Sequence, residues 1–225
     1  IAELVQNNVR SVPEMASLKL TRAIVVQREL KSAEEISELD KAVDISVEMH
    51  LAGMRYARPG MRESEVAAKV AEVAHAANGN PSFPIIATIN GQTLHNHYHG
   101  NIIKSGDLFL LDAGAETENR YAGDLSSTFP VDPTFTPVQK EIYQLCLDAH
   151  MAAVGMLKPG TAFKDVHLTA CRTIFEGLKA FGLTKGDTAE AVEAGAHAMF
   201  FPCGTGHMMG LDVHDMENLG EQWVG

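Results

Sequence analysis

Two aspartates twelve residues apart carry the clearest chemical signal in the sequence. Asp112 ends the apolar run Leu108–Leu111, and Asp124 follows in a second, partly apolar run. The polar patch between the runs predicts a β-hairpin. We expect a three-residue loop centred on Glu118, with Asn119 in the left-handed conformation. This hairpin would place the two aspartates directly opposite each other.

Opposed carboxylates would create an electrostatic problem in a partly buried sheet. Opposed side chains lie on one face, with Cβ atoms roughly 4.5–5.5 Å apart. Two carboxylates that close repel, so one takes up a proton or a cation lies between them. On this stretch alone, an exposed hairpin with two solvated acids explains the residues equally well.

Histidines are the second group of candidates. His95, His97 and His99 alternate, so in a strand all three would point to one face. Such a run is more often a solvated strand or loop than a metal site. We interpret the four histidines of the expected helices as structural residues: His50, His75, His150 and His167.

The glycine-rich segment from Cys203 to Asp215 is more specific. Its glycines allow tight turns and close approach, which can place His207 where a helix could not reach. His207 and His214 are seven residues apart, so a strand would send them to opposite faces. We therefore expect different roles for them, one as a ligand and one in hydrogen bonding or proton handling. Carboxylates with one imidazole suit Mn²⁺, Co²⁺, Fe²⁺ or Zn²⁺.

Helices and short strands would position these residues. The expected elements are a helix capped by Ser32 and Glu35 that stops at 58–60, a helix from Glu63 toward Gly79, a β-prone run at 83–89, a helix from Thr136-Pro137 to 158–160, a helix over 163–181, and a short helix capped by Asp187 and Glu190. Residues 1–30 include a β-prone run at 23–26 and read as a linker or the remnant of an upstream domain.

One pattern repeats after 100 residues. Arg58-Pro59-Gly60 recurs as Lys158-Pro159-Gly160, each time between two amphipathic helices. Pro-Gly is common in the turns between helices, so chance is one explanation of the repeat. The other is two related αα-β halves around a shared site. The order of elements favours an α+β fold over a doubly wound parallel sheet.

Composition excludes several partners. The 225 residues carry a net charge of −11, from 18 basic and 29 acidic side chains, without a Lys/Arg cluster. We therefore expect no nucleic acid and no membrane as partner. Three widely spaced cysteines favour a reducing, cytoplasmic location. The first residue, Ile1, and the polar end at Gly225 suggest a piece of a longer protein.

Several short motifs, in order, resemble the pita-bread metallopeptidases, and within them the aminopeptidase P (Xaa-Pro aminopeptidase) and prolidase branch. The matching pieces are Leu94-His95, Asp112-Ala113-Gly114, Tyr121-Ala122-Gly123-Asp124, Thr128-Phe129-Pro130, and Gly206-His207 through Asp212-Val213-His214-Asp215. The resemblance covers roughly residues 30–225. It implies an α+β pita-bread fold, with pseudo-twofold αα-β halves around a curved antiparallel sheet that is incomplete at the C-terminus. Residues 31–225 would form the catalytic domain.

The resemblance also implies residue roles. Asp112, Asp124 and His207 would be three of the five ligands of two divalent metal ions, with Mn²⁺ first and Co²⁺ or Zn²⁺ as alternatives. His95 and His214 would bind the substrate amide and handle its proton, as catalytic and substrate-binding residues.

Two departures from the family pattern stand out. Cys203 occupies a position where the family often has histidine. The last two ligands of the family are glutamates further downstream, and Glu217 and Glu221 come too early to take those places. We therefore expect the two glutamates beyond Gly225, so the piece would be inactive by itself.

The implied function is a metal-dependent peptidase that hydrolyses the Xaa-Pro bond at the N-terminus of peptides or in dipeptides, through a hydroxide that bridges the metals. Its substrate would be a peptide with proline at the second position, and the enzyme would be a homodimer. The alternatives are a metal-free creatinase-like hydrolase that works through histidine, or a non-catalytic binding module of the same fold. Such relatives usually lose ligand carboxylates, whereas both aspartates are present here.

Overall fold

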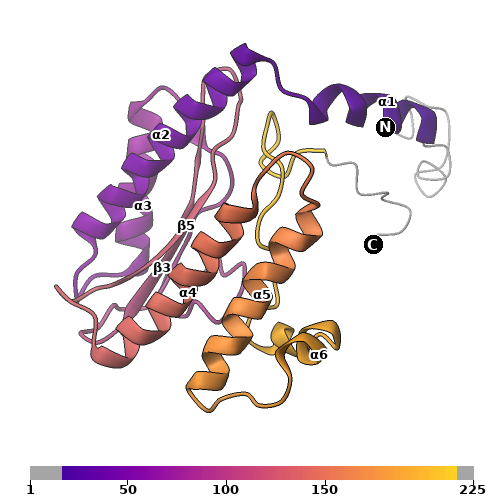
Figure 1. The fold of residues 1–225 in the computed structure, drawn as a ribbon. Coiled ribbons are helices and arrows are strands. Elements are labelled where there is room, and N and C mark those ends of the chain that lie inside the picture. The colour runs from indigo at the N-terminus through magenta and orange to yellow at the C-terminus, as the bar shows by residue number, and fades with distance from the viewer. Residues whose placement is uncertain (1–16, 217–225) are drawn as a thin grey trace, which may run out of the picture. The chain divides into compact units, whose positions relative to one another are not determined.

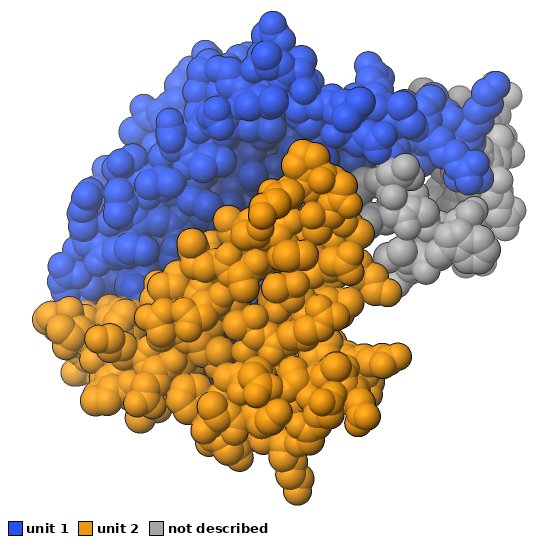
Figure 2. Space-filling model, in the orientation of Figure 1, with its two compact units in different colours: residues 1–104, 108–129, 208–225 blue, residues 105–107, 130–207 orange. Residues whose placement is uncertain are grey.

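The computed structural model describes residues 17–216, which fall into two compact units (Figures 1 and 2). Of the described residues, unit 1 contains 17–104, 108–129 and 208–216. Unit 2 contains residues 105–107 and 130–207. No helix in the described range is long and apolar enough to cross a membrane. Glu217 and Glu221 lie outside that range.

Three helices open unit 1: α1 (Leu18–Glu29), α2 (Ala33–Tyr56) and α3 (Glu63–Ala76). The predicted capping box of Ser32 and Glu35 is confirmed at the start of α2. The β-prone run at 23–26 lies inside α1, so that prediction was wrong. Ser17 caps α1 by accepting a hydrogen bond from the backbone N–H of Leu20. β-Branched residues lower helix propensity only slightly, so a cap outweighs them.

The strands of unit 1 form two small antiparallel sheets. In the three-stranded sheet, β3 (Leu108–Ala113) lies between β2 (Ile86–Thr88) and β5 (Leu125–Pro130). In the other sheet, β1 (Asn80–Pro81) pairs with β4 (Ala115–Glu116).

Burial alternates along β3. Phe109, Leu111 and Ala113 are buried, whereas Asp112 is only partly buried. Leu111 points toward Gly53 of α2, so the apolar face of β3 packs against that helix. Figure 1 shows α2 and α3 beside these strands. Asp112 therefore lies on the opposite, half-open face of the sheet.

The predicted hairpin exists, but its turn differs. Glu118 to Arg120 form a loop of three residues, the predicted length, closed by a 3.0 Å bond from the N–H of Thr117 to the carbonyl of Tyr121. Arg120 takes the left-handed conformation, with φ +70°, instead of Asn119. The loop centres on Asn119, one residue later than Glu118.

Because the loop is centred one residue later, each residue of β3 faces a residue two positions further along the second arm of the hairpin than predicted. Glu116 pairs with Ala122, and a ladder continued without a bulge from that pair places Asp112 opposite Ser126. Asp124 then lies diagonally from Asp112 on the same face of the sheet. The predicted direct opposition of the two aspartates was therefore wrong, although they remain neighbours.

Two glycines let the hairpin approach its surroundings closely. A methyl group at Gly114 would overlap the carbonyl oxygen of Gly123. The N–H of Gly123 donates a 2.8 Å bond to the carbonyl of Ala115, whose own N–H donates to the hydroxyl of Ser46 on α2. Ser82 donates a 2.7 Å bond to the carbonyl of Gly123. These contacts hold both aspartate-bearing segments against α2.

Unit 2 is helical. It contains α4 (Pro137–Met156), α5 (Phe163–Ala180), α6 (Thr188–Glu193) and the 3₁₀ helix η3 (Ala196–Met199). The predicted caps at Thr136 and Asp187 are confirmed. α4 and α5 lie side by side (Figure 1). The buried core of this unit includes a cluster of Ala153, Val166 and Ala170, and a second cluster of Cys171, Phe175 and Val192.

The repeated Pro-Gly turns adopt the same backbone conformation. Gly60 and Gly160 both have positive φ, +96° and +87°, and each joins a pair of packed helices. The helical pairs thus repeat as expected. Within residues 17–216, α5 is followed by α6 and η3 and not by strands.

We predict that Gly114→Ala destabilises the protein by about 2 kcal/mol or more, because the added methyl group must displace the backbone of Gly123. Thermal unfolding followed by circular dichroism measures this loss. Gly155→Ala on α4 is the control, since nothing lies within 4 Å of its added methyl group and alanine favours a helix. An unchanged midpoint for Gly114→Ala would contradict the close contact.

Candidate metal centre

Asp112 and Asp124 form a close carboxylate pair in unit 1. Asp112 is on β3, and Asp124 immediately precedes β5. Burial and then the negative charge of Asp124 raise the pKa of Asp112 from 3.8 to about 6, and a hydrogen bond from Ser126 offsets part of the rise. The two carboxyl groups also hydrogen-bond to each other, which favours a protonated Asp112.

This pair suits a divalent cation. Two carboxylates this close repel unless they share a proton or a positive charge lies beside them. This repulsion contributes to the raised pKa of Asp112. A bound cation would reverse the local electrostatics and keep both groups ionised. Hard oxygen ligands with nearby imidazole match Mn²⁺, Co²⁺ or Zn²⁺. The residues present therefore fit the predicted metal ions.

His214 lies next to this pair. A ring nitrogen of His214 and a carboxylate oxygen of Asp124 are within 4.8 Å of each other. The imidazole is exposed, so it can meet a ligand that enters from solvent.

His95 approaches the pair from a loop. It is exposed, has φ +50°, and exerts an electrostatic effect on Asp112. Residues 95–99 form no strand, so the three histidines do not share a strand face, and the favoured interpretation of a solvated loop is confirmed for His95 and His97. The ring of His99 is instead bonded to the carbonyl of Ile85 at 3.0 Å. His97 is exposed.

His207 belongs to unit 2, of which it is the last residue, and it is partly exposed. The segment around it is irregular, so strand parity does not govern His207 and His214. Cys203, nearby in the sequence, is exposed and makes no disulfide. Of the five predicted site residues, Asp112, Asp124, His95 and His214 come together within unit 1.

Glu63 holds the loop that carries His95, a role the sequence did not reveal. This first residue of α3 is fully buried and accepts hydrogen bonds from Thr88, Ile89 and Asn101, among them one of 2.8 Å from the N–H of Ile89. The N–H of Glu63 donates to the carbonyl of Asn101. Glutamate is common in the first turn of a helix, so nothing in the neighbouring sequence indicated that Glu63 is buried.

Asp215 fixes the chain beside His214. It is buried and pairs with Arg28 at 2.6 Å and Lys31 at 2.9 Å. Burial alone would raise the pKa of Asp215, but hydrogen bonds from Lys31 and the N–H of Met216, together with the two positive charges, lower it. The basic partners lie more than 180 residues earlier in the chain, so sequence motifs did not reveal this network.

His50 is a structural residue, as predicted. Its ring is bonded to the carbonyl of Ala113 at 3.0 Å and to the hydroxyl of Ser127 at 2.7 Å. Burial lowers the pKa of His50, so the ring is neutral at pH 7. It thereby joins α2 to the strands on both sides of the aspartate pair.

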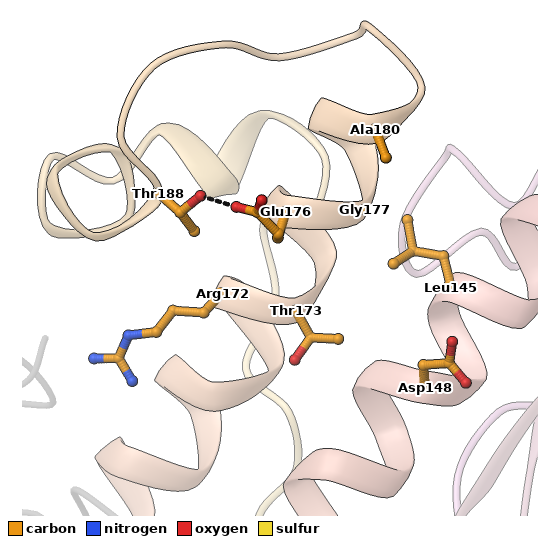
Figure 3. Close-up of a pocket in the computed structure, with 8 residues that line it drawn as sticks. All are labelled: Leu145, Asp148, Arg172, Thr173, Glu176, Gly177, Ala180 and Thr188. Carbon is orange, nitrogen blue, oxygen red and sulfur yellow. Dashed lines mark hydrogen bonds between the residues drawn. The ribbon is translucent and has the colours of Figure 1, made fainter.

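One surface hollow is lined by other residues. A cavity of about 650 Å³ on unit 2 is lined by Leu145, Asp148, Arg172, Thr173, Glu176, Gly177, Ala180 and Thr188 (Figure 3). Glu176 and Thr188 are hydrogen-bonded at its edge. None of the predicted site residues lines it. The carboxylate pair has the stronger chemical claim, because its two negative charges repel each other, whereas Glu176 is bonded to Lys179 and Thr188.

Comparison with known proteins agrees with the chemistry of the pair. Residues 37–223 match the model of metallopeptidase family M24. The Xaa-Pro aminopeptidase of Escherichia coli K12 is 37% identical over 200 residues, which cover 86% of this chain and 44% of that protein. The Xaa-Pro aminopeptidase of Haemophilus influenzae is 35% identical over 200 residues, covering 86% and 46%.

Solved structures give the same relationship. Aminopeptidase PepP of Pseudomonas aeruginosa superimposes with a TM-score of 0.83 at 35% identity, covering 85% of this chain and 44% of that one. An Escherichia coli aminopeptidase P variant in complex with substrate gives 0.83 at 36% identity, covering 89% and 46%. The chain thus spans about half the length of the relatives it matches.

We predict that Asp112→Asn stabilises the metal-free protein at pH 7.5 by on the order of 1 kcal/mol, a value reduced for partial exposure. Because the pKa of Asp112 is raised, the contribution of this residue to stability is complete below pH 3.8 and is lost as the pH rises through about 6. The gain should therefore be smaller at pH 4.5. Urea unfolding in a chelator measures it, with Asp44→Asn on the exposed side of α2 as control. A less stable variant at pH 7.5 would contradict the repulsion.

We predict that Asp215→Asn costs about 3 kcal/mol at pH 7, because it leaves Arg28 and Lys31 without their buried counter-charge. Asp212→Asn is a matched control: Asp212 also pairs with Arg28, but is exposed, so its loss should cost under about 1 kcal/mol. Since the pKa of Asp215 is lowered, its contribution exists above pH 3.8 and disappears at lower pH. Equal denaturation midpoints for the two variants would refute the buried network.

Proposed function

The chain belongs to metallopeptidase family M24, and from this premise we propose that it is the catalytic part of an aminopeptidase that hydrolyses the peptide bond before proline. It has the α+β pita-bread fold of its structural neighbours. The observation that carries the proposal is the close pair of Asp112 and Asp124, with a raised Asp112 pKa that favours a bound cation. Relatives named Xaa-Pro aminopeptidase support the choice of substrate.

We assign the ligands as follows. Asp112 and Asp124 hold two divalent ions, Mn²⁺ in the first place, with Co²⁺ or Zn²⁺ as alternatives. A zinc-substituted Escherichia coli aminopeptidase P among the structural neighbours is consistent with exchange of the metal. His207 is the third ligand by its place in the family motif. When bound, the ions supply Lewis acidity and lower the pKa of a water to generate the nucleophile.

The histidines of unit 1 act on the substrate. His214, beside Asp124, and His95, beside Asp112, bind the substrate amide and move its proton. The bond before proline is a tertiary amide without an N–H, so the site selects the shape of the ring and needs no acceptor for that nitrogen. The position of Asp215 between Arg28 and Lys31 keeps the neighbouring His214 in place. The homodimer and the cytoplasmic location stay predictions.

We predict that Asp124→Asn, in the full-length protein, lowers kcat/KM on a peptide with proline at position two by more than about a hundredfold. Loss of an outer partner of a metal ligand costs 10–100-fold, so loss of a ligand costs more. Bound Mn²⁺, measured by elemental analysis, should fall in parallel. Glu118→Gln, in the exposed loop of the same hairpin, is the control and should retain metal and turnover.

Two results would overturn the proposal. One is undiminished turnover by Asp124→Asn or by wild type freed of metal, which would favour a metal-free hydrolase. The other is equal cleavage when alanine replaces proline in the peptide, which would remove the specificity.

A further inference from the structure

A second cluster of potential metal ligands lies within unit 2, apart from the residues assigned above. His167 and Cys171 are one helical turn apart on α5, and His197 is on η3. Each offers a ligand atom, and these atoms all lie within 4.8 Å of one another. The Sγ of Cys171 is 3.3 Å from the Nε2 of His167.

The cluster is built into the core of unit 2. Cys171 is fully buried, packed with Phe175 and Val192. The ring of Phe201 covers His167, with 5.6 Å between ring centroids. A thiol with two imidazoles in an apolar surround is a soft, low-dielectric environment, which favours a metal that binds sulfur and nitrogen.

The two histidines differ in their hydrogen bonds. The Nδ1 of His167 is bonded to the hydroxyl of Thr205 at 2.8 Å, which orients the ring with Nε2 toward Cys171. Such an outer partner is typical of a metal-binding histidine. The Nδ1 of His197 is buried and has no hydrogen-bond partner among the described residues. An unpaired buried nitrogen costs free energy, and a metal bound through it would remove that cost.

The spacing matches tetrahedral zinc. With a Zn–S bond of about 2.3 Å and a Zn–N bond of about 2.05 Å, tetrahedral geometry places sulfur and nitrogen about 3.6 Å apart. The observed 3.3 Å between Cys171 and His167 is close to that value. A hydrogen-bonded core of cysteine, histidine and threonine would explain His167, but it leaves the buried Nδ1 of His197 without a partner.

We propose that His167, Cys171 and His197 form a structural Zn²⁺ site, with a water as the fourth ligand. On binding, the thiol of Cys171 loses its proton to solvent and the thiolate bonds to the metal. The site joins α5 to η3, and through Thr205 it restrains the segment that leads to His207. Its ligands include sulfur, whereas those assigned to the catalytic metals are oxygen and nitrogen.

Titration of the metal-stripped, full-length protein with Co²⁺ tests the proposal. Only a thiolate ligand gives a sulfur-to-cobalt charge-transfer band in the near ultraviolet, so the catalytic metals do not contribute to it. The expected result is a band with the intensity of one thiolate-bound Co²⁺ per chain, which disappears when Zn²⁺ is added. Cys171→Ser should abolish the band, while Cys146→Ser and Cys203→Ser, at the two exposed cysteines, should retain it.

A second variant, His197→Gln, tests the proposal even if the Cys171→Ser protein fails to fold. His197 is on the short η3, where a substitution disturbs less of the core, and the variant should bind Co²⁺ more than about tenfold more weakly. Circular dichroism and Xaa-Pro turnover should be near those of wild type. The proposal is overturned if folded wild type gives no band, if folded Cys171→Ser retains it, or if His197→Gln binds Co²⁺ as tightly as wild type.

Discussion

The close backbone contact between Gly114 and Gly123 is the constraint on which unit 1 depends. Neither position has room for a side chain, and the carbonyl and amide groups on both sides are bonded to Ser46, Ser82 and Ala115. The contact draws the two arms of the hairpin together and seats them on α2. Asp112 and Asp124 lie just outside it, one on each arm, so their proximity follows from backbone packing and not from any attraction between them.

Three acidic residues of unit 1 lie in three different electrostatic environments. Glu63 is buried but satisfied by hydrogen bonds from Thr88, Ile89 and Asn101. Asp215 is buried but held between Arg28 and Lys31, which lower its pKa. Asp112 instead faces a second carboxylate, and its pKa rises. Thus Glu63 and Asp215 support the site, and the aspartate pair is where a cation gains most.

The two units use different chemistry for their sites. Unit 1 offers carboxylates and exposed imidazoles, which suit exchangeable ions and a substrate that enters from solvent. Unit 2 offers a buried thiol with two partly buried imidazoles, which suits a metal that stays in place. A structural metal at His197 would restrain the loop that carries Thr205 and leads to His207.

The sequence by itself indicated the helices from α2 onward, the candidate ligand types and the family. Caps at Ser32, Thr136 and Asp187 are local signals, readable because a helix end is fixed by residues three apart. The tertiary structure decided the rest. The hairpin register depends on which loop residue adopts positive φ, and Arg120 does so instead of Asn119. Partners such as Glu63 with Asn101, Arg28 with Asp215, and Cys171 with His197 are distant in the chain, and only packing of the elements selects them.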